Sequence, residues 1–471
     1  MPEEEQTDDL VTTAHAIGGL AYTATAGRIA LRQEVHDEDT FTGHVVKADV
    51  FLTSYTLNGV NPRERPVTFA FNGGPGSSSV WLHLGLLGPR RVLMGDVGEL
   101  RPPPYGLADN AETLLTVSDL VFIDPISTGY SRAAKGEKSK DFHGYQADLE
   151  SVAEVIRLWT SRNGRWMSPK YLCGESYGTL RAAGLSEHLQ ERYGLYLNGL
   201  MLISSILDAG TVETAGHNDL PYALFLPTFA AVANYHGRHG ERPLRDVLND
   251  AERFALGDYR QALDEGDRQA DRAGIVRHLA ALTGLSEDFL DRVNLRVDEG
   301  RFFAELMRSD RRTVGRLDGR FLGWAADAGQ ERIGADPSYH AIQGPYTAAL
   351  NHYVRAELSY ANDLPYEILT DRVQPWSYKE FEGQHVHVAD KLAAAMRANQ
   401  HLRVYVASGY YDSATPYFAT RHTFAHLAIP AELRSNIQFA DFEAGHMMYV
   451  HEPSRQTQSA QLAAFVEATH S

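Results

Sequence analysis

The segment YLCGESYGTLRAAGLSEHLQERYG, residues 171–194, decides how the chain is expected to fold. YLCGES (171–176) is strand-like, and TLRAAGLSEHLQERYG (179–194) has the spacing of an amphipathic helix. Between them, GESYG (174–178) matches G-x-S-x-G, in which a serine occupies a tight turn from strand to helix. So short a pattern also occurs by chance, and a turn without chemistry is the alternative. The flanking strand and helix favour Ser176 as an exposed nucleophile.

Apolar strands alternate with helices on both sides of this segment. Short apolar runs, typical of buried strands, occur at VTFAF (67–71), DLVFID (119–124), LNGLMLISS (197–205), LRVYVASG (402–409) and NIQFADFEAG (436–445). This alternation predicts an α/β fold with a mostly parallel central sheet flanked by helices on both faces. Ahead of these runs, HVVKADVFLTSYTL (44–57) alternates like a half-exposed strand, and a turn-rich stretch joins it to VTFAF. The two are expected to form an antiparallel hairpin.

Residues 208–365 have a different character. They are rich in Asp, Arg and Ala, with helical patches such as IVRHLAALTG and FFAELMR, and they show no convincing buried strand. We therefore expect a core formed by residues 1–207 and 366–471 and a mainly helical cap insertion, 208–365, over the mouth of the site. The insertion should lie between two strands of the sheet.

A serine nucleophile needs a base and a group that orients the base. LRVYVASG leads directly to Asp412, and NIQFADFEAG leads directly to His446. Ligand sites of parallel sheets lie at such strand ends, and the order Ser, Asp, His is that of the α/β-hydrolase fold. A lone Asp is usually a turn or cap residue, and a lone His is usually structural. Both in the required order favour Ser176, Asp412 and His446 as a catalytic triad.

The glycine-rich turn NGGPG (72–76) directly follows the strand VTFAF. A turn at this place can bring backbone N–H groups against a developing oxyanion. A phosphate-binding loop is disfavoured because the turn lacks the Lys-Ser/Thr ending and opens no clear G-x-G-x-x-G helix. A purely structural turn is the remaining alternative.

The composition of the 471-residue chain limits its partners. Its net charge of −17 argues against nucleic acid, and no apolar run of about 18 residues indicates a membrane span. The start, MPEEEQTDDL, shows no secretory signal, and the single cysteine, Cys173, excludes an intrachain disulfide. These features predict a cytoplasmic protein, although a chain whose signal had been removed would look the same. A homodimer stays open.

Histidine pairs offer a possible alternative chemistry. His385 with His387 and His236 with His239 have spacings that could chelate a metal, but no acidic partner motif accompanies them. Structural roles are favoured, so we expect neither a metal nor another cofactor.

Five ordered motifs resemble those of the serine carboxypeptidase family, a branch of the α/β-hydrolase superfamily. They are FNGGPGSSSVWLHLGLLGP, IDPISTGYS, GESYG, SGYYD and EAGHMMYVHEP, spread over about residues 67–455. The resemblance includes a large insertion between nucleophile and aspartate, where the family has its cap. It implies a peptide substrate and release of C-terminal residues through an acyl-enzyme intermediate.

The resemblance also implies roles for individual residues. Ser176 attacks the scissile carbonyl, His446 takes its proton and Asp412 holds the imidazole. The backbone N–H groups of Gly74 and Tyr177 form the oxyanion hole. Asn72 and Glu175 bind the terminal carboxylate of the substrate, which requires Glu175 to be protonated. A carboxyl buried beside a bound carboxylate should have a raised pKa.

The chain departs from the family at two informative places. Many members have Cys where this chain has Ser77, together with several disulfides, so the resemblance points to a bacterial-type form without disulfides. Many also have Glu where this chain has Leu86, and that Glu would pair with the equivalent of Glu175. Recognition of the terminal carboxylate is therefore less secure than the triad.

Three functions remain to be compared. The first is a serine carboxypeptidase. The second is an esterase, peptide amidase or acyltransferase that uses the same triad. The third is a non-catalytic binding protein, which is disfavoured because Ser176, Asp412 and His446 are all present.

Overall fold

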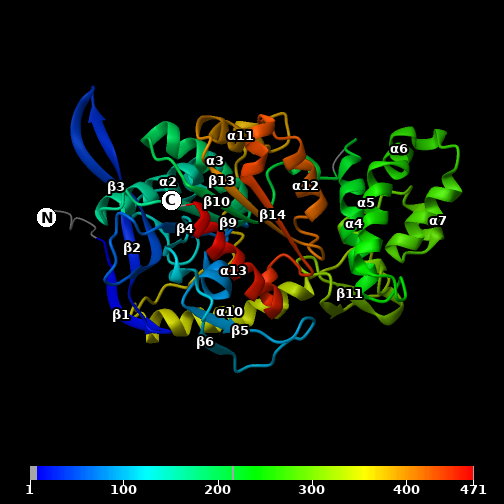
Figure 1. The fold of residues 1–471 in the computed structure, drawn as a ribbon, viewed down its shortest axis with the longest axis horizontal. Helices are drawn as coiled ribbons and strands as arrows, with labels where there is room; N and C mark the ends of the chain where they lie inside the picture. The colour runs from blue at the N-terminus through cyan, green and yellow to red at the C-terminus, as the bar shows by residue number, and fades with distance from the viewer. Residues whose placement is uncertain (1–7, 215–216, 470–471) are drawn as a thin grey trace.

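A central sheet organises the molecule (Figure 1). The computed structural model describes residues 8–214 and 217–469, so the acidic start, residues 1–7, lies outside the described residues. The strands in sheet order are β1 (Val11–Ile17), β2 (Leu20–Asp37), β3 (Thr40–Leu57), β7 (Asp119–Ile123), β4 (Val67–Phe71), β9 (Lys170–Ser176), β10 (Gly199–Ser205), β13 (Arg403–Gly409) and β14 (Ile437–Phe442), and β8 (Arg132–Ala133) pairs with β3. Neighbouring strands from β7 to β14 are parallel, whereas β1, β2, β3 and β7 pair antiparallel. The predicted mostly parallel sheet is confirmed.

Helices cover both faces of this sheet (Figure 1). The apolar cluster on one face includes side chains of α2 (Tyr145–Arg162), α3 (Tyr177–Tyr193), α11 (Ala389–Ala398) and α12 (Tyr417–Ala425), and the cluster on the other includes side chains of α10 (Pro337–Ala356) and α13 (Glu452–Thr469). Along β4, Phe69 and Phe71 point into the first cluster and Ala70 into the second. Because both faces are covered, the inner strands are mostly apolar. Within the described ranges, no helix is long and apolar enough to cross a membrane.

Short elements connect the main ones. They are α1 (Val80–Leu82), η1 (His83–Leu87), η2 (Leu114–Thr116), η3 (Ser139–Phe142), η4 (Ala209–Thr211), η5 (Gly266–Arg268), η6 (Arg308–Asp310), η7 (Lys379–Phe381), η8 (Ala431–Asn436), η9 (Met448–Val450) and the antiparallel pair β5 (Arg90–Leu93) and β6 (Gly106–Asp109).

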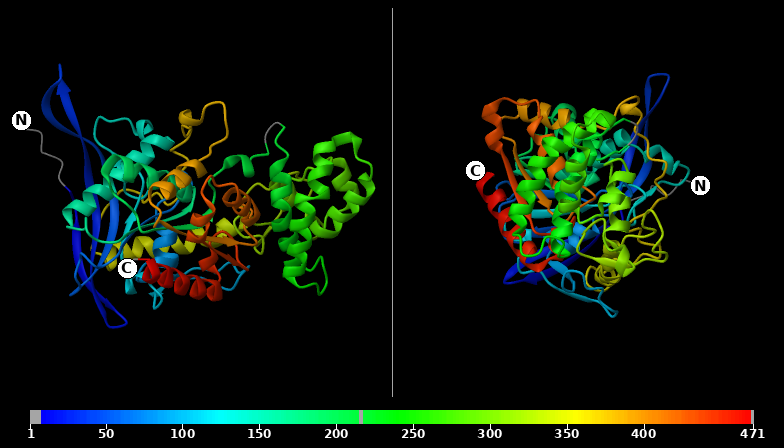
Figure 2. Two further views of the ribbon diagram at one scale, coloured as in Figure 1. Left: turned by 45° about the horizontal axis from the view of Figure 1, so that its top comes forward. Right: turned by 90° about the vertical axis from the view of Figure 1, so that its right-hand side faces the viewer.

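The predicted hairpin between residues 44–57 and 67–71 is wrong. β3 pairs with β2 over its whole length, and its other edge pairs with β7, which therefore separates β3 from β4. The turn-rich stretch between β3 and β4 thus crosses over the position of β7 instead of closing a hairpin. β4 is buried on both faces and takes parallel partners on both edges, which suits its unbroken apolar run. The ends of β2 and β3 project from the body of the molecule (Figure 2).

The chain between β10 and β13 leaves the main sheet, although these two strands are parallel neighbours. It forms α4 (Leu220–Tyr235), α5 (Leu244–Leu256), α6 (Asp258–Glu265), α7 (Arg272–Thr283), α8 (Glu287–Arg292), α9 (Glu299–Glu305) and the small hairpin of β11 (Arg312–Val314) and β12 (Leu322–Trp324). These helices pack around their own apolar cluster beside the sheet (Figures 1 and 2). In contrast, α10 packs against the sheet cluster through Ile342 and Tyr346. The division of the chain at 208 and 365 stays a prediction.

A buried ion pair fixes α3 beneath the site. Arg181 is 1% exposed, and its Nε lies 2.7 Å from Asp148 Oδ2 on α2. A second nitrogen of the guanidinium donates to the backbone oxygen of Asn72 at 2.7 Å. This one side chain therefore joins two helices to the loop that follows β4.

We expect Asp148→Ala to destabilise the protein by about 3–5 kcal/mol, because it leaves the charge of Arg181 buried without a partner. Urea unfolding measures this loss. Glu150→Ala, on the exposed side of the same helix, is the control and should change stability by about 0.5 kcal/mol or less. Equal losses in the two variants would contradict the prediction.

Candidate active site

Ser176 lies where β9 ends and α3 begins. Its backbone has φ 60° and ψ −129°, a strained conformation for a residue with a side chain, which costs about 1–3 kcal/mol. The turn is also tightly packed, because an ideal Cβ on Gly174 would lie 2.2 Å from the backbone oxygen of Gly178. The predicted strand-to-helix turn is therefore present, and it requires glycine before the serine.

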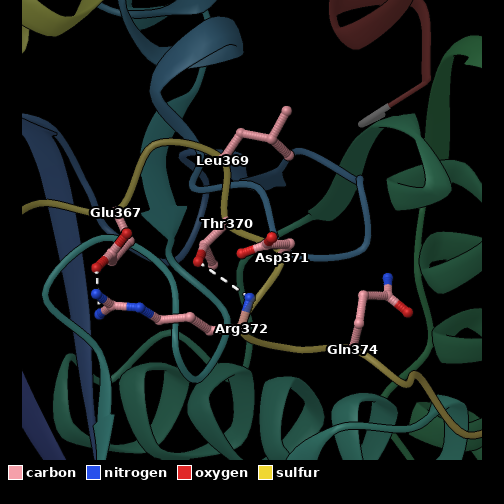
Figure 3. A pocket seen from close by; sticks show the side chains of 6 residues that line it. All are labelled: Glu367, Leu369, Thr370, Asp371, Arg372 and Gln374. Atoms are coloured by element: carbon pink, nitrogen blue, oxygen red, sulfur yellow. Dashed lines mark hydrogen bonds and ion pairs between the residues drawn. The ribbon is translucent and has the colours of Figure 1, made fainter.

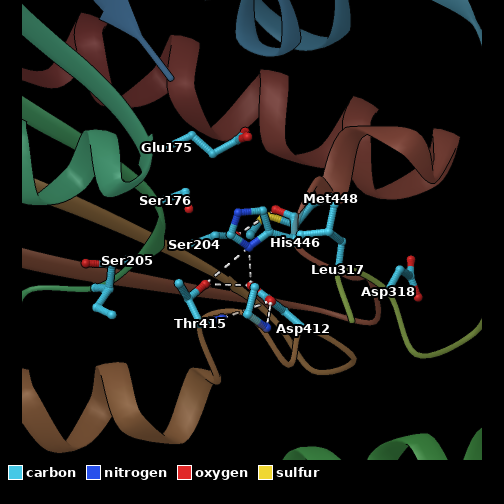
Figure 4. Close-up of polar contacts among 12 residues, drawn as sticks. Glu175, Ser176, Ser204, Ser205, Leu317, Asp318, Asp412, Thr415, His446 and Met448 are labelled. Atoms are coloured by element: carbon cyan, nitrogen blue, oxygen red, sulfur yellow. Dashed lines mark hydrogen bonds and ion pairs between the residues drawn. The ribbon is translucent and has the colours of Figure 1, made fainter. Parts of the chain in front are cut away.

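His446 and Asp412 form a buried pair (Figure 4). His446 Nδ1 lies 2.8 Å from Asp412 Oδ2, and their exposed fractions are 4% and 0%. The other oxygen of Asp412 accepts from the backbone N–H groups of Ala414 and Thr415, and the Thr415 hydroxyl donates to Oδ2 at 2.6 Å. Burial alone would lower the pKa of His446, but attraction by Asp412 and the hydrogen bond to it raise this pKa above its usual value. A proton on Nδ1 leaves Nε2 free to act as a base.

A cavity of about 210 Å³ brings most of the predicted residues together. Ser176, His446, Asn72, Gly74 and Glu175 all line it. Asp412 is connected to the cavity through His446, and Tyr177 stands at the start of α3. Ser176 and His446, both within the described part of the chain, are not hydrogen-bonded to each other. Such contacts often tighten only around bound substrate.

The two proposed oxyanion donors lie on adjacent segments. Tyr177 is the first residue of α3, so its N–H has no acceptor within the helix and stands at the positive end of the helix dipole. Gly74 has φ 101°, and an ideal Cβ on its neighbour Gly73 would lie 2.4 Å from the Tyr177 nitrogen. The glycine-rich loop and the helix start are thus in direct contact, as an oxyanion hole requires.

Glu175 and Asn72 are hydrogen-bonded inside the cavity. Asn72 Nδ2 donates to Glu175 Oε1 at 2.9 Å, and the Tyr449 hydroxyl donates to Oε2 at 2.6 Å. Glu175 is 3% exposed, and burial raises its pKa to about 7 against the lowering effects of His446 and these hydrogen bonds. This carboxyl group can therefore change its protonation near neutral pH.

Comparison with known proteins agrees with these motifs. A family model described as serine carboxypeptidase matches residues 45–220. Two relatives from Arabidopsis thaliana align with parts of the chain: serine carboxypeptidase-like 13 is 28% identical over 209 residues, and serine carboxypeptidase-like 5 is 30% identical over 125 residues. Residues 45–220 of the chain are therefore similar to the serine carboxypeptidase family.

The extent of these matches is limited. The aligned segments cover 42% and 25% of this chain and 42% and 26% of the two relatives. The range matched by the family model contains Asn72 and Ser176 but ends before Asp412 and His446. The crystal structure of Kex1, a prohormone-processing carboxypeptidase from Saccharomyces cerevisiae, superposes with a TM-score of 0.56 at 15% identity and covers 95% of this chain and 92% of that one. This superposition confirms the predicted α/β-hydrolase fold.

Several residues around the site were missed by the sequence reasoning. Thr415 holds Asp412, and Tyr449 holds Glu175. Leu86, where many family members have Glu, is buried in an apolar cluster and offers Glu175 no polar partner. The Tyr449 hydroxyl bonds to Glu175 instead, which the family pattern did not indicate. The sequence does show Tyr449 three residues after His446, but the neighbouring residues do not indicate that its hydroxyl points toward Glu175.

Segments outside the sheet complete the walls. Arg316, Leu317, Tyr339 and Ile342, all from the inserted part of the chain, line the cavity together with Leu369. Leu369 also borders an open depression of about 590 Å³ whose other side chains are polar or charged, including Glu367, Asp371 and Arg372 (Figure 3). Leu369 therefore lies between the cavity and an open surface that a longer ligand could follow.

The Tyr449 hydroxyl stabilises the ionised form of Glu175, so Tyr449→Phe should raise the pKa of Glu175 by roughly one unit. The measurement is an infrared titration of the carboxyl band, with Glu175→Gln identifying the signal. Tyr405→Phe removes another buried hydroxyl, one bonded to Gln461, and should leave the band unchanged. A titration that is equally unchanged in Tyr449→Phe would contradict the assigned role.

Proposed function

We propose that this protein is a serine carboxypeptidase that releases C-terminal residues from peptides through an acyl-enzyme. One observation carries the proposal: Ser176 at a strained turn and the buried carboxyl of Glu175 line the same cavity. The first can supply a nucleophile, and the second can bind a terminal carboxylate when it is protonated. The match of residues 45–220 to the serine carboxypeptidase family model supports the same activity.

The geometry supports a sequence of proton transfers. His446 Nε2 would take the proton of Ser176 as the hydroxyl attacks the scissile carbonyl, and Asp412 would hold the imidazole. The N–H groups of Gly74 and Tyr177 would stabilise the resulting oxyanion. His446 would then give its proton to the leaving amine, and water would hydrolyse the acyl-enzyme by the reverse order of transfers. These steps use only side chains, backbone groups and water.

Selection of the chain end would depend on Asn72 and Glu175. Glu175 directly precedes the proposed nucleophile and would lie beside the scissile bond, and Asn72 begins the loop that would supply the oxyanion donor Gly74. A protonated Glu175 can donate to a terminal carboxylate, whereas an ionised one repels it. The pKa of about 7 makes the protonated form available in neutral and acidic solution.

One observation favours the alternative of an esterase, peptide amidase or acyltransferase. Both oxygens of Glu175 accept hydrogen bonds, and the Asn72 amide is already bonded to Glu175. In this arrangement the hydrogen-bonding groups of Asn72 and Glu175 already have partners within the protein. A substrate carboxylate would have to displace one of these hydrogen bonds. A substrate without a terminal charge would not need that exchange.

We also propose a cytoplasmic location. The single cysteine, Cys173, is fully buried within β9, so the fold does not depend on a disulfide and suits a reducing compartment.

Replacement of the triad should abolish turnover while the fold remains. Ser176→Ala should remove labelling by a fluorophosphonate probe, and Asp412→Asn and His446→Ala should lower kcat by about 10³- to 10⁶-fold. Ser205→Ala is a matched control, since this neighbouring buried serine ends the adjacent strand β10. Labelling of Ser176→Ala at the wild-type level would contradict the assignment, and an unlabelled wild-type protein would favour a non-catalytic role.

Hydrolysis of peptides with a free carboxylate should fall as pH rises through about 7, because Glu175 becomes ionised and repels the substrate. Amidated peptides and esters lack this charge and should not show the fall. Both kinds of substrate should lose activity in acid, where His446 is protonated. The measurement is kcat/KM across pH for matched free and amidated peptides.

Glu175→Gln should flatten the alkaline fall, since glutamine donates a hydrogen bond at every pH. Glu443→Gln removes an exposed carboxyl near His446 in the sequence and serves as the control. If amidated and free peptides were cleaved equally at every pH, the exopeptidase proposal would fail in favour of an esterase or amidase.

A further inference from the structure

A fixed positive charge stands at the wall of the cavity. Arg316 lines the cavity together with Glu175, Ser176 and His446, and its side chain is exposed. Among the described residues that line this cavity, Arg316 is the one whose side chain is always cationic. Its charge also acts on His446, whose pKa it tends to lower. The guanidinium therefore lies within electrostatic reach of the reacting groups.

The backbone of Arg316 is held in place from three sides. Its N–H donates to Asp336 Oδ1 at 3.0 Å, and its carbonyl accepts from the N–H of Ser413 at 3.1 Å. The carbonyl of the next residue, Leu317, accepts from the N–H of His446 at 2.6 Å. Arg316 is thus anchored between the loops that carry Asp412 and His446, although it belongs to the inserted part of the chain.

In contrast, the guanidinium of Arg316 has no ion pair or hydrogen bond to any residue that the structure describes. Nearby arginines are engaged: Arg320 pairs with Asp318, and Arg312 lies over the ring of Trp324. Asp336 does not neutralise Arg316 through a contact of side chains, because its oxygens accept from backbone N–H groups and from Ser338. An anchored backbone and an unpaired head group at a cavity wall are what an anion-binding arginine requires.

We infer that Arg316 binds a carboxylate of the peptide substrate beside the scissile bond. The inference rests on the proposed peptide hydrolysis and adds a specificity-determining residue to it. The carboxylate can be that of the chain end. Arg316 would then supply a positive charge, which neither Asn72 nor Glu175 can carry. The carboxylate can also come from an acidic side chain next to the scissile bond. A guanidinium suits either source because its planar fork matches a carboxylate.

Binding to inactive protein tests this inference without turnover. In the Ser176→Ala background, calorimetry measures Kd for tetra-alanine and for tetra-alanine with glutamate at the last or penultimate position, each as free acid and as amide. Arg316→Gln should raise Kd by roughly 10- to 100-fold for peptides that carry the relevant carboxylate. If the substitution weakens binding of every free-acid peptide and of no amide, the carboxylate that Arg316 binds is that of the chain end. Losses on glutamate peptides in both forms identify the acidic side chain. Arg316→Lys should retain part of the affinity, since it keeps the charge without the fork.

Arg277→Gln is the matched control, because it makes the same charge change at an exposed position on α7, a helix that contributes no residue to the cavity lining. Equal losses in Arg277→Gln and Arg316→Gln would show a general electrostatic effect and overturn the inference. Unchanged Kd for every peptide in Arg316→Gln, or no binding of any peptide to the Ser176→Ala parent, would also overturn it. Failure of the proposed function has a different signature, namely absence of C-terminal trimming by the wild-type protein.

Discussion

The close contact between the loop after β4 and the turn after β9 is the constraint on which this site depends. A Cβ on Gly73 would meet the Tyr177 nitrogen at 2.4 Å, and a Cβ on Gly178 would meet the Phe71 oxygen at 2.7 Å. Only glycine allows the backbones to approach so closely, and this approach brings the glycine-rich loop to the start of α3. Arg181 secures the contact from below by binding both Asp148 and the Asn72 carbonyl. The strained backbone of Ser176 can persist because its surroundings are rigid.

The inserted part of the chain lines the candidate site as well as standing beside the sheet. The stretch after β11 is bonded to both triad loops: Gly319 donates to the Tyr411 carbonyl, and Arg320 donates to the Glu443 carbonyl at 2.9 Å. Figure 4 shows Leu317 beside His446, and the N–H of His446 donates to the Leu317 carbonyl at 2.6 Å. Any movement of this stretch would therefore move the loops that hold Asp412 and His446. Under the proposed function, substrate selection and the placement of the base would be linked through the same backbone contacts.

The sequence predicts those features that leave a local pattern. GESYG between a strand and a helix, and strand ends followed by Asp412 and His446, were sufficient to choose Ser176 and His446, which line one cavity, and Asp412, which is bonded to His446. The pairing of β3 was mispredicted because alternation of apolar and polar residues shows that a strand is half exposed but does not show which strand it pairs with. The roles of Tyr449 and Arg316 could not be predicted, since each depends on contacts between segments far apart in sequence. Local patterns were therefore enough to propose Ser176, Asp412 and His446 as a triad, whereas the contacts of Tyr449 and Arg316 left no local pattern.

Glu175 and His446 affect each other's protonation across the cavity. An ionised Glu175 raises the pKa of His446, and a protonated His446 lowers the pKa of Glu175. The neutral pair and the charged pair contain the same number of protons, so pH alone does not choose between them. Burial favours the neutral pair, because both groups are almost fully removed from water. A substrate carboxylate beside Glu175 would favour it further, since it repels an ionised Glu175. Binding of a chain end would then replace the charge of Glu175 by that of the substrate carboxylate, while Asp412 continues to raise the pKa of His446.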